Sequence, residues 1–325
     1  CSRRSGPSLR CRGRPPDARA PDRRLRAGPL RALGTVADGR PGPGEVHVRV
    51  EAAALNPLDA KLARGDMTGW FLLVFPYGPG TDFAGEVVEV GEGVIDLHVG
   101  DAVLGRSDPV AGAAMAEAVV VPSRFVARRP AGLDAVTAAC LPTPAGIAHQ
   151  ALFDHLHVSE GGTLLILGAG GAVGSAALQL TPGGVEVIAC AGRQGGSAPT
   201  SPAQWVRPEE PDVLRAVAEA DYVLDCAGGD LQRRAFAAMR PGAKLAAIVT
   251  PPDEAAAVAR GIEATFLVLE TRPDTLAAVA DAAALGVLRP EPPALFRLEE
   301  SAATYRDYVA GRRTGKLVMT AGGGR

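Results

Sequence analysis

One stretch of the chain joins a buried strand, a glycine-rich turn and a helix. Residues 161–185 carry no charged side chain, and within them the apolar run from Thr163 to Leu167 leads directly into GAGGAVG. Residues Val173 to Leu180 then have helical spacing. A turn between the carboxyl end of a strand and the start of a helix directs backbone N–H groups at an anion, so we expect a pyrophosphate to bind there. The residues predicted to contact it are Gly168, Ala169, Gly170, Gly171, Ala172, Val173 and Gly174.

The chain after residue 130 alternates between short apolar runs and stretches that are helical or irregular. After the first run, further runs occur at Val185 to Ala189, Tyr222 to Asp225, Leu245 to Val249 and Thr265 to Leu269. Runs that are apolar on both faces and alternate with helices are typical of a parallel sheet covered on both sides. We therefore predict a doubly wound α/β domain over residues 136–285.

The part of the chain before residue 130 contains short strands separated by Gly, Pro and Asp. Residues Glu45 to Val50 alternate, with three valines on one face. Closely spaced short strands with glycine turns predict a small, partly open β-barrel. A final strand at Lys316 to Thr320 is expected to return to this barrel, which we assign to residues 36–135 and 286–325. The other strands expected in it are Gly85 to Gly91, Ala102 to Gly105, Glu117 to Pro122 and Ala294 to Leu298.

The first 40 residues differ from the rest in charge. They contain eleven arginines and three aspartates, and they show no apolar periodicity. We interpret residues 1–35 as a disordered or targeting leader, because an Arg-rich, acid-poor composition fits an import peptide while the apolar face of such a helix is missing. We expect a cytoplasmic protein, with organelle import through this leader left open.

Charge and cysteine content exclude several classes of function. Beyond residue 40 the chain has ten more acidic than basic side chains, so no nucleic-acid partner is expected. The uncharged stretch at 161–185 is long enough to cross a bilayer, but its glycines indicate a turn, so no membrane partner is expected either. The five cysteines form no CxxC pair, which indicates neither a disulfide framework nor a zinc site.

The end of the second strand of the α/β domain indicates which dinucleotide binds. An NAD site has an Asp or Glu there for the ribose 2′-hydroxyl, whereas this chain continues VIACAGR, with Arg193 and no carboxylate. A guanidinium group binds a 2′-phosphate that a carboxylate would repel. We therefore predict NADP(H) as the cofactor, with Arg193 as a contact. The alternative for Arg193 is a solvated loop charge.

At this point the sequence resembles the medium-chain dehydrogenase/reductase superfamily, and within it the zinc-independent quinone oxidoreductase branch that includes zeta-crystallin. The motifs that carry the resemblance lie in order along residues 41–321 and include PGPGEVHVRVEAAALNPLDAKLARG, GTDFAGEVVEVGEGV, VGDAVLG, AEAVVVP, DYVLDCAGG, RPGAKL and TGKLVMT. The resemblance implies a GroES-like, partly open β-barrel domain interrupted by a Rossmann domain, with the active site in the cleft between them. It also implies that a homodimer is possible.

The resemblance also bears on a metal. Zinc-dependent relatives have a Cys at the position of Asn56 and a His-Glu pair at the positions of Thr81 and Asp82, and they carry a four-cysteine lobe that is missing here. Without thiolate or imidazole ligands a tetrahedral zinc site cannot form. We therefore expect no metal.

Without a metal as Lewis acid, oxidation of simple alcohols is disfavoured, and a conjugated acceptor is the easier substrate. Hydride from nicotinamide can add to a quinone or an α,β-unsaturated carbonyl while hydrogen-bond donors stabilise the enolate. By resemblance Asn56 lies at the cleft floor, where it donates to the substrate oxygen or orients the nicotinamide ribose, and Lys316 approaches the cofactor. Tyr77 is the candidate proton donor, with solvent or a packing role as alternatives.

The sequence therefore predicts an NADPH-dependent, zinc-independent reductase of quinones or of enone and enoyl substrates. Two alternatives stay open. One is a non-catalytic or regulatory, crystallin-like dinucleotide-binding protein, which the unusual N-terminus and the Gly-, Ser- and Pro-rich segment 192–203 favour. The other is an enoyl reductase of polyketide or fatty-acid assembly.

Overall fold

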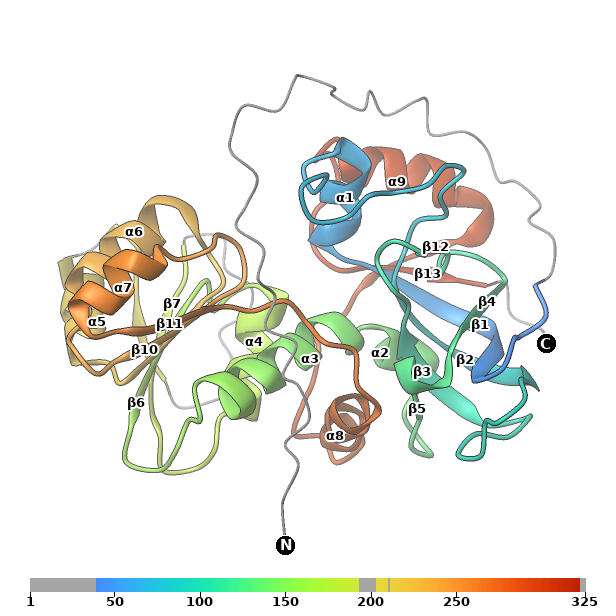
Figure 1. Ribbon diagram of the computed structural model, residues 1–325, viewed down its shortest axis with the longest axis horizontal. Helices are drawn as coiled ribbons and strands as arrows, with labels where there is room; N and C mark the ends of the chain where they lie inside the picture. Colours follow the sequence, from blue (N-terminus) through green and yellow to red (C-terminus); the bar gives the residue numbers. More distant parts are fainter. Residues whose placement is uncertain (1–38, 193–202, 210, 322–325) are drawn as a thin grey trace, which may run out of the picture.

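The computed structural model describes residues 39–192, 203–209 and 211–321, which form two lobes (Figure 1). One lobe contains a parallel sheet with helices on both faces, and the other contains an antiparallel barrel-like sheet, so the predicted fold class is confirmed. The predicted leader and Arg193 lie outside the described residues. Within the described ranges, every helix is too short or too polar to cross a membrane.

The parallel sheet has the strand order β11-β10-β9-β6-β7-β8. This is the order of a Rossmann sheet, in which the direction of winding reverses next to the first strand, here between β6 and β9. The apolar run of β6 pairs on both sides, with β7 and with β9, so it lies at the centre of the sheet. The strands are β6 (Thr163–Leu167), β7 (Glu186–Cys190), β8 (Gln204–Val206), β9 (Tyr222–Asp225), β10 (Lys244–Ala247) and β11 (Glu263–Phe266).

Helices cover both faces of this sheet because its central strands are apolar on both sides. One face packs against α3 (Pro142–His149) and α4 (Ala172–Leu180), while α8 (Pro273–Ala284) packs on α3 and on the second lobe (Figure 1). The other face packs against α5 (Pro211–Glu219), α6 (Gly229–Ala238) and α7 (Glu254–Arg260). The two sides of β6 therefore belong to two different cores.

The barrel domain is built on one long strand. β1 (Glu45–Leu55) pairs with three others, β2, β4 and β13, and a β-bulge between Val50 and Ala52 bends it. The C-terminal strands join the N-terminal ones in this sheet, as the sequence predicts. The other strands are β2 (Asp82–Val90), β3 (Ala102–Arg106), β4 (Ala118–Pro122), β5 (Val126–Arg128), β12 (Ala294–Arg297) and β13 (Leu317–Thr320), and the helices are α1 (Pro57–Arg64), α2 (Ala135–Ala139) and α9 (Ser301–Val309).

The core between the lobes is rich in alanine. Ala52, Ala54 and Ala84 from the barrel face α2 and α3 without a gap, because small side chains let the helices approach the sheet closely. This face of the barrel sheet carries the cleft residues described below.

Two helical features were not expected from the sequence pattern. One is the π-helical segment Gln150–His155, which continues α3. The other is α1, which follows β1 directly. π-helical turns often occur at functional sites, and the one at Gln150–His155 faces the segment that returns from the Rossmann sheet to α8.

Candidate active site

The glycine turn lies at the carboxyl end of β6. The N–H groups of Gly168 and Ala169 both donate to the Cys190 carbonyl oxygen at 2.9 Å, and Gly171 N–H donates to Gly168 O at 3.0 Å. These bonds tie the turn to the end of β7, and α4 begins at Ala172. The turn therefore has the strand–turn–helix geometry that its sequence predicts.

Gly174 explains why the turn can be so tight. A Cβ atom at this position would lie 2.5 Å from Gly168 O and 2.6 Å from Ala169 Cα, both backbone atoms. The helix thus packs directly on the turn, and the N–H groups of Ala172, Val173 and Gly174 find no acceptor among the described residues. Free N–H groups at a helix N-terminus suit a pyrophosphate, so this part of the site fits a dinucleotide.

The turn lies beside the point where the sheet reverses its winding. Cys226, just after β9, donates its N–H to Leu167 O at 2.9 Å, and its backbone lies against Gly168. Asp225 is buried, and its Oδ1 accepts from the N–H groups of Ala227 and Gly228 at 2.9 Å each. Burial raises the pKa of Asp225. Its bonds to the following backbone indicate that it shapes the loop after β9.

Asn56 connects β1 to α1 and is 4 % exposed. Its Oδ1 accepts a hydrogen bond from Lys316 Nζ at 2.8 Å. An ammonium group can only donate, so this contact sets the orientation of the amide and leaves Nδ2 as a donor. Nδ2 is buried and has no partner among the described residues. The structure thus brings the two predicted residues together and presents an unused donor.

Asp59 supports Asn56 from the first turn of α1. Its Oδ2 accepts the Asn56 backbone N–H at 2.7 Å, and its backbone carbonyl accepts a hydrogen bond from the Tyr305 hydroxyl at 2.9 Å. Burial raises the pKa of this carboxyl to about 7, against its hydrogen bond with Asn56. These bonds give Asp59 a structural role, which is to hold the backbone at the start of α1.

Tyr77 lies in the segment that follows α1. Its hydroxyl donates to the Pro109 carbonyl oxygen at 2.9 Å. Burial, followed by the negative charges of Asp59 and Asp108, raises the pKa of Tyr77. The hydroxyl proton of Tyr77 is thus already used in the hydrogen bond to Pro109.

A buried polar network beside Asn56 was not expected from the sequence. Asp82 accepts the Thr143 N–H at 2.9 Å and the Thr143 hydroxyl at 2.5 Å. Arg106 is 5 % exposed; its Nε donates to Thr143 Oγ1 and its Nη1 to Thr271 Oγ1, each at 3.0 Å. Burial lowers the pKa of Arg106, while the neighbouring carboxylates, Asp82 foremost, raise it. The network joins the barrel to the Rossmann domain.

The positions that hold zinc in zinc-dependent relatives are occupied here by Asn56, Thr81 and Asp82, with the Arg106 guanidinium 4.0 Å from Asp82. In the part of the chain that the structure describes, no three His, Cys, Asp or Glu side chains gather in a way that could hold a metal ion. The expectation of a metal-free site therefore stays a prediction, based on the residues at these positions.

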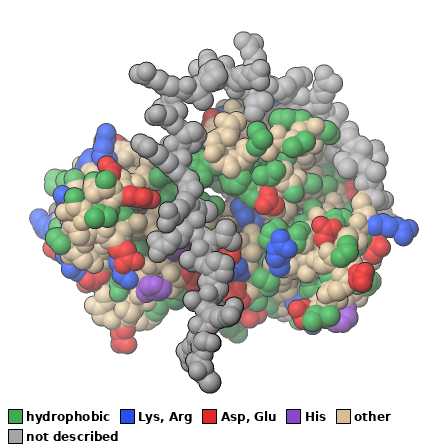
Figure 2. Space-filling view, viewed as in Figure 1, with side chains coloured by type: hydrophobic (Ala, Val, Ile, Leu, Met, Phe, Trp, Pro, Cys, Tyr) green, Lys and Arg blue, Asp and Glu red, His purple; other side chains and the backbone are tan. Residues whose placement is uncertain are grey.

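The two domains also meet at an aromatic contact. Trp70, 54 % exposed and two turns beyond α1, lies against Phe266 at the end of β11, with 5.4 Å between ring centroids. Figure 2 shows hydrophobic side chains gathered over the region of α1 and α9. The exposed apolar residues of the segment after α1 are Trp70, Leu72, Val74 and Phe75.

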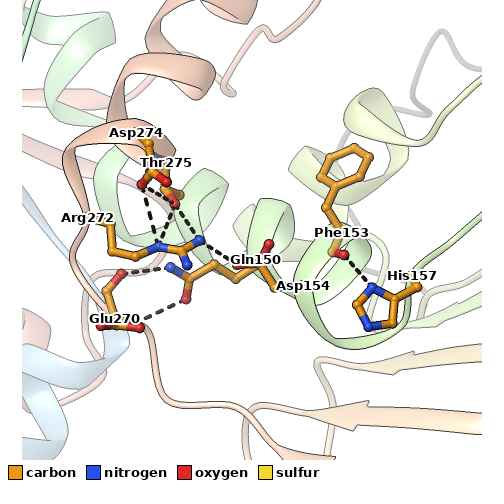
Figure 3. A network of polar contacts seen from close by, with 8 residues as sticks. All are labelled: Gln150, Phe153, Asp154, His157, Glu270, Arg272, Asp274 and Thr275. Atoms are coloured by element: carbon orange, nitrogen blue, oxygen red, sulfur yellow. Dashed lines mark hydrogen bonds and ion pairs between the residues drawn. The ribbon is translucent and has the colours of Figure 1, made fainter. Parts of the chain in front are cut away.

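The segment from β11 to α8 is held by the π-helical turn (Figure 3). Gln150 Nε2 donates to the Glu270 carbonyl oxygen at 2.7 Å, and the Glu270 N–H donates to Gln150 Oε1 at 3.2 Å. Arg272 forms an ion pair with Asp154 at 2.5 Å. Because Thr271, the partner of Arg106, lies in this segment, the network fixes how the Rossmann domain approaches the cleft floor.

Comparisons with known proteins agree with this geometry. Residues 42–131 match the family model of the alcohol dehydrogenase GroES-like domain, and residues 200–319 match the model named zinc-binding dehydrogenase. The chain is 26 % identical to the quinone oxidoreductase from Coxiella burnetii, with a TM-score of 0.76 over 90 % of this chain and 96 % of that structure.

Two curated relatives have related activities in their names. A chloroplastic quinone-oxidoreductase homolog from Spinacia oleracea is 37 % identical over 47 % of this chain and 48 % of its own length. The trans-enoyl reductase himH from Aspergillus japonicus is 32 % identical over 57 % and 59 %, respectively. The chain thus spans about half the length of the curated relatives it matches.

Proposed function

We propose that this chain, which belongs to the medium-chain dehydrogenase/reductase superfamily, is an NADPH-dependent oxidoreductase that reduces quinones or α,β-unsaturated carbonyl compounds. The observation that carries the proposal is the unpaired hydrogen-bond donor of the Asn56 side-chain amide. Lys316 holds its oxygen, and its buried Nδ2 is a donor without a partner among the described residues. A buried unsatisfied donor is costly unless a ligand completes it.

The residues that would hold the cofactor are the free N–H groups at the start of α4 and the Asn56–Lys316 pair. Reduced nicotinamide, when bound, supplies a hydride. The chain's part is to fix the two ends of the dinucleotide, one at the glycine turn and the other near the barrel. Arg193 is proposed to favour the 2′-phosphate; tighter binding of NADH than of NADPH in a fluorescence titration would refute that preference.

The acceptor is proposed from the donors at the cleft floor. With Asn56, Thr81 and Asp82 at the zinc positions, the floor offers hydrogen bonds where a metal would supply a Lewis acid. Hydrogen bonds suffice for an acceptor whose negative charge spreads over a conjugated system, as in quinones and enones. The exposed apolar side chains near Trp70 suit such apolar acceptors.

Two sources of the proton that completes the reduction are open, Tyr77 and solvent. The bond from Tyr77 to the Pro109 carbonyl and the raised pKa of the phenol both oppose transfer from Tyr77, so we propose that water supplies the proton. Tyr77→Phe would then keep its turnover within about threefold and lose about 1 kcal/mol of stability with the hydrogen bond. A larger loss of turnover would return Tyr77 to the mechanism.

A panel of acceptors tests the proposed function. NADPH oxidation with a naphthoquinone, an enone and an enoyl thioester should show turnover with the first two. Preference for the thioester would support an enoyl reductase of polyketide or fatty-acid assembly, as the relative from Aspergillus suggests. NADPH binding without turnover on any acceptor would support the non-catalytic alternative.

We also propose that the chain forms a homodimer through the outer edge of the Rossmann sheet. β11 pairs with β10 on one side and forms the edge of the sheet on the other. An open strand edge can pair with a second copy. Light scattering after size-exclusion chromatography would show twice the chain mass, and a monomer at micromolar concentration would refute the proposal.

A further inference from the structure

Arg106 occupies a place in the sheet that points its side chain at the core between the lobes. Across three neighbouring strands, Ala54 is the register partner of Asp82, and Asp82 is the register partner of Arg106. Directly opposite residues point to the same face of a sheet, and Ala54 belongs to the core between the lobes. Asn56 follows Ala54 by two residues, so the alternation directs it to that face as well.

Two nitrogen atoms of the guanidinium group form hydrogen bonds, and the third has a donor that is free among the described residues. Nε is bound to Thr143 and Nη1 to Thr271, whereas Nη2 donates to no group in the described ranges. Nη2 is not fully buried, so it keeps some contact with solvent. The side chain is therefore held rigidly by two threonines and retains a charged donor that nothing in the protein uses.

The charged groups around Arg106 leave its guanidinium group able to bind an anion. The carboxylate of Asp82 has the Thr143 N–H and hydroxyl as hydrogen-bond donors, and it is 4.0 Å from the guanidinium. Lys316 lies near by on Asn56. A cation that is fixed and partly shielded from water acts more strongly on a developing negative charge than an exposed one.

We propose that Arg106 is a catalytic residue that donates a hydrogen bond from Nη2 to the carbonyl oxygen of the acceptor and stabilises the enolate formed there. This inference rests on the proposed function. When the β-carbon of an enone gains a hydride from reduced nicotinamide, the C=C π electrons form the new C=C bond to the carbonyl carbon, and the carbonyl π electrons move to oxygen. A proton from water then adds to the α-carbon, so the acceptor is reduced and the nicotinamide oxidised.

Binding of an enolate mimic tests the proposal independently of turnover. The probe is 2-hydroxy-1,4-naphthoquinone, which is an anion with delocalised oxygen charge at neutral pH, and the comparison compound is the neutral 2-methyl-1,4-naphthoquinone. Affinities are measured with NADP⁺ present, from the quenching of the intrinsic tryptophan fluorescence of the protein. We expect the wild-type protein to bind the anion at least about tenfold more tightly, and equal affinities would overturn the proposal.

Variants assign that preference to Arg106. Arg106→Gln should remove the preference and lower kcat about 100-fold while the KM for NADPH stays within about threefold. Arg128→Gln is the matched control, because Arg128 lies on β5 of the same sheet but is exposed and paired with Asp101. If Arg106→Gln retained the anion preference, or lost affinity for both quinones equally, the proposal would be wrong.

Folding is checked by thermal unfolding and NADPH affinity, since Arg106 also braces the network. Should Arg106→Gln fail to fold, Arg106→Lys decides. Lysine keeps the charge, but its donors sit on a single nitrogen that cannot take the separate positions of Nε, Nη1 and Nη2, so the preference should fall at least about fivefold. An unchanged preference would overturn the assignment. Absence of NADPH-dependent turnover in the wild-type protein would refute the proposed function instead, and the binding assay would still report on Arg106.

Discussion

Gly174 offers the sharpest test of the glycine turn. A methyl group at this position would lie 2.5 Å from Gly168 O, whereas ordinary contact begins near 3.4 Å, so the turn and α4 must separate by about 0.9 Å. The three nearest atoms that the methyl group meets all belong to the backbone, which has no side-chain freedom to relax. Overpacking of this kind costs about 1–3 kcal/mol, which lowers the melting temperature of a chain of this size by about 2–10 °C.

Separation of the turn from α4 also displaces the free N–H groups that we assign to the pyrophosphate. We expect Gly174→Ala to weaken NADPH binding at least about tenfold, which corresponds to about 1.4 kcal/mol. Gly183→Ala is the matched control, because a Cβ at Gly183 meets nothing within 4 Å and its φ is not positive. Differential scanning fluorimetry and a fluorescence titration measure both quantities. Unchanged stability and affinity in Gly174→Ala would refute the proposed geometry of the turn.

Three further substitutions test other parts of the cleft. Asn56→Asp keeps an acceptor for Lys316 but removes the Nδ2 donor, so kcat/KM for a naphthoquinone should fall about 100-fold. A decrease of less than threefold would contradict the proposed role of Asn56. The folded-state pKa of Asp59, about 7, exceeds its ordinary value of 3.8. Between these two pH values the folded protein therefore holds one proton more than the unfolded chain. The free energy of unfolding then falls as pH rises through this window, by up to about 4 kcal/mol. Asp59→Asn should remove that slope in urea titrations at several pH values, and an unaltered slope would show that another group causes it. Trp70→Ala should raise the KM for a naphthoquinone about 2–10-fold with kcat unchanged. The control is Leu285→Ala, at an exposed apolar residue at the end of α8, which should leave both constants unchanged. Equal effects of the two substitutions would show that the aromatic contact is not specific.

Some elements could be predicted from the sequence because their signals are local. β6 and β9 have the predicted bounds, since a buried parallel strand needs a short run that is apolar on both faces. The turn after β6 has its glycines where the helix packs on the backbone. In contrast, β8 has three residues and follows a segment rich in Gly, Ser and Pro, so its pairing with β7 has no signal of its own.

The part of the site that the sequence could not predict depends on distant partners. Arg106 stands between Gly and Ser after a short strand, a context typical of an exposed turn. It is buried because Thr143 and Thr271, 37 and 165 residues further along the chain, accept its hydrogen bonds. Trp70 likewise meets Phe266 only when the two domains are assembled. Asn56 and Lys316 were identified by family resemblance, and the structure adds that they contact each other.

The central claim, that hydride passes from a bound dinucleotide to a conjugated acceptor, is tested most directly by isotope transfer. The full chain is incubated with an enone and NADPH carrying deuterium on the transferred face of nicotinamide C4, and the product is examined by mass spectrometry and NMR. We predict one deuterium at the β-carbon and none at the α-carbon. Bound NADPH that is not oxidised, or product without deuterium at the β-carbon, would contradict the claim.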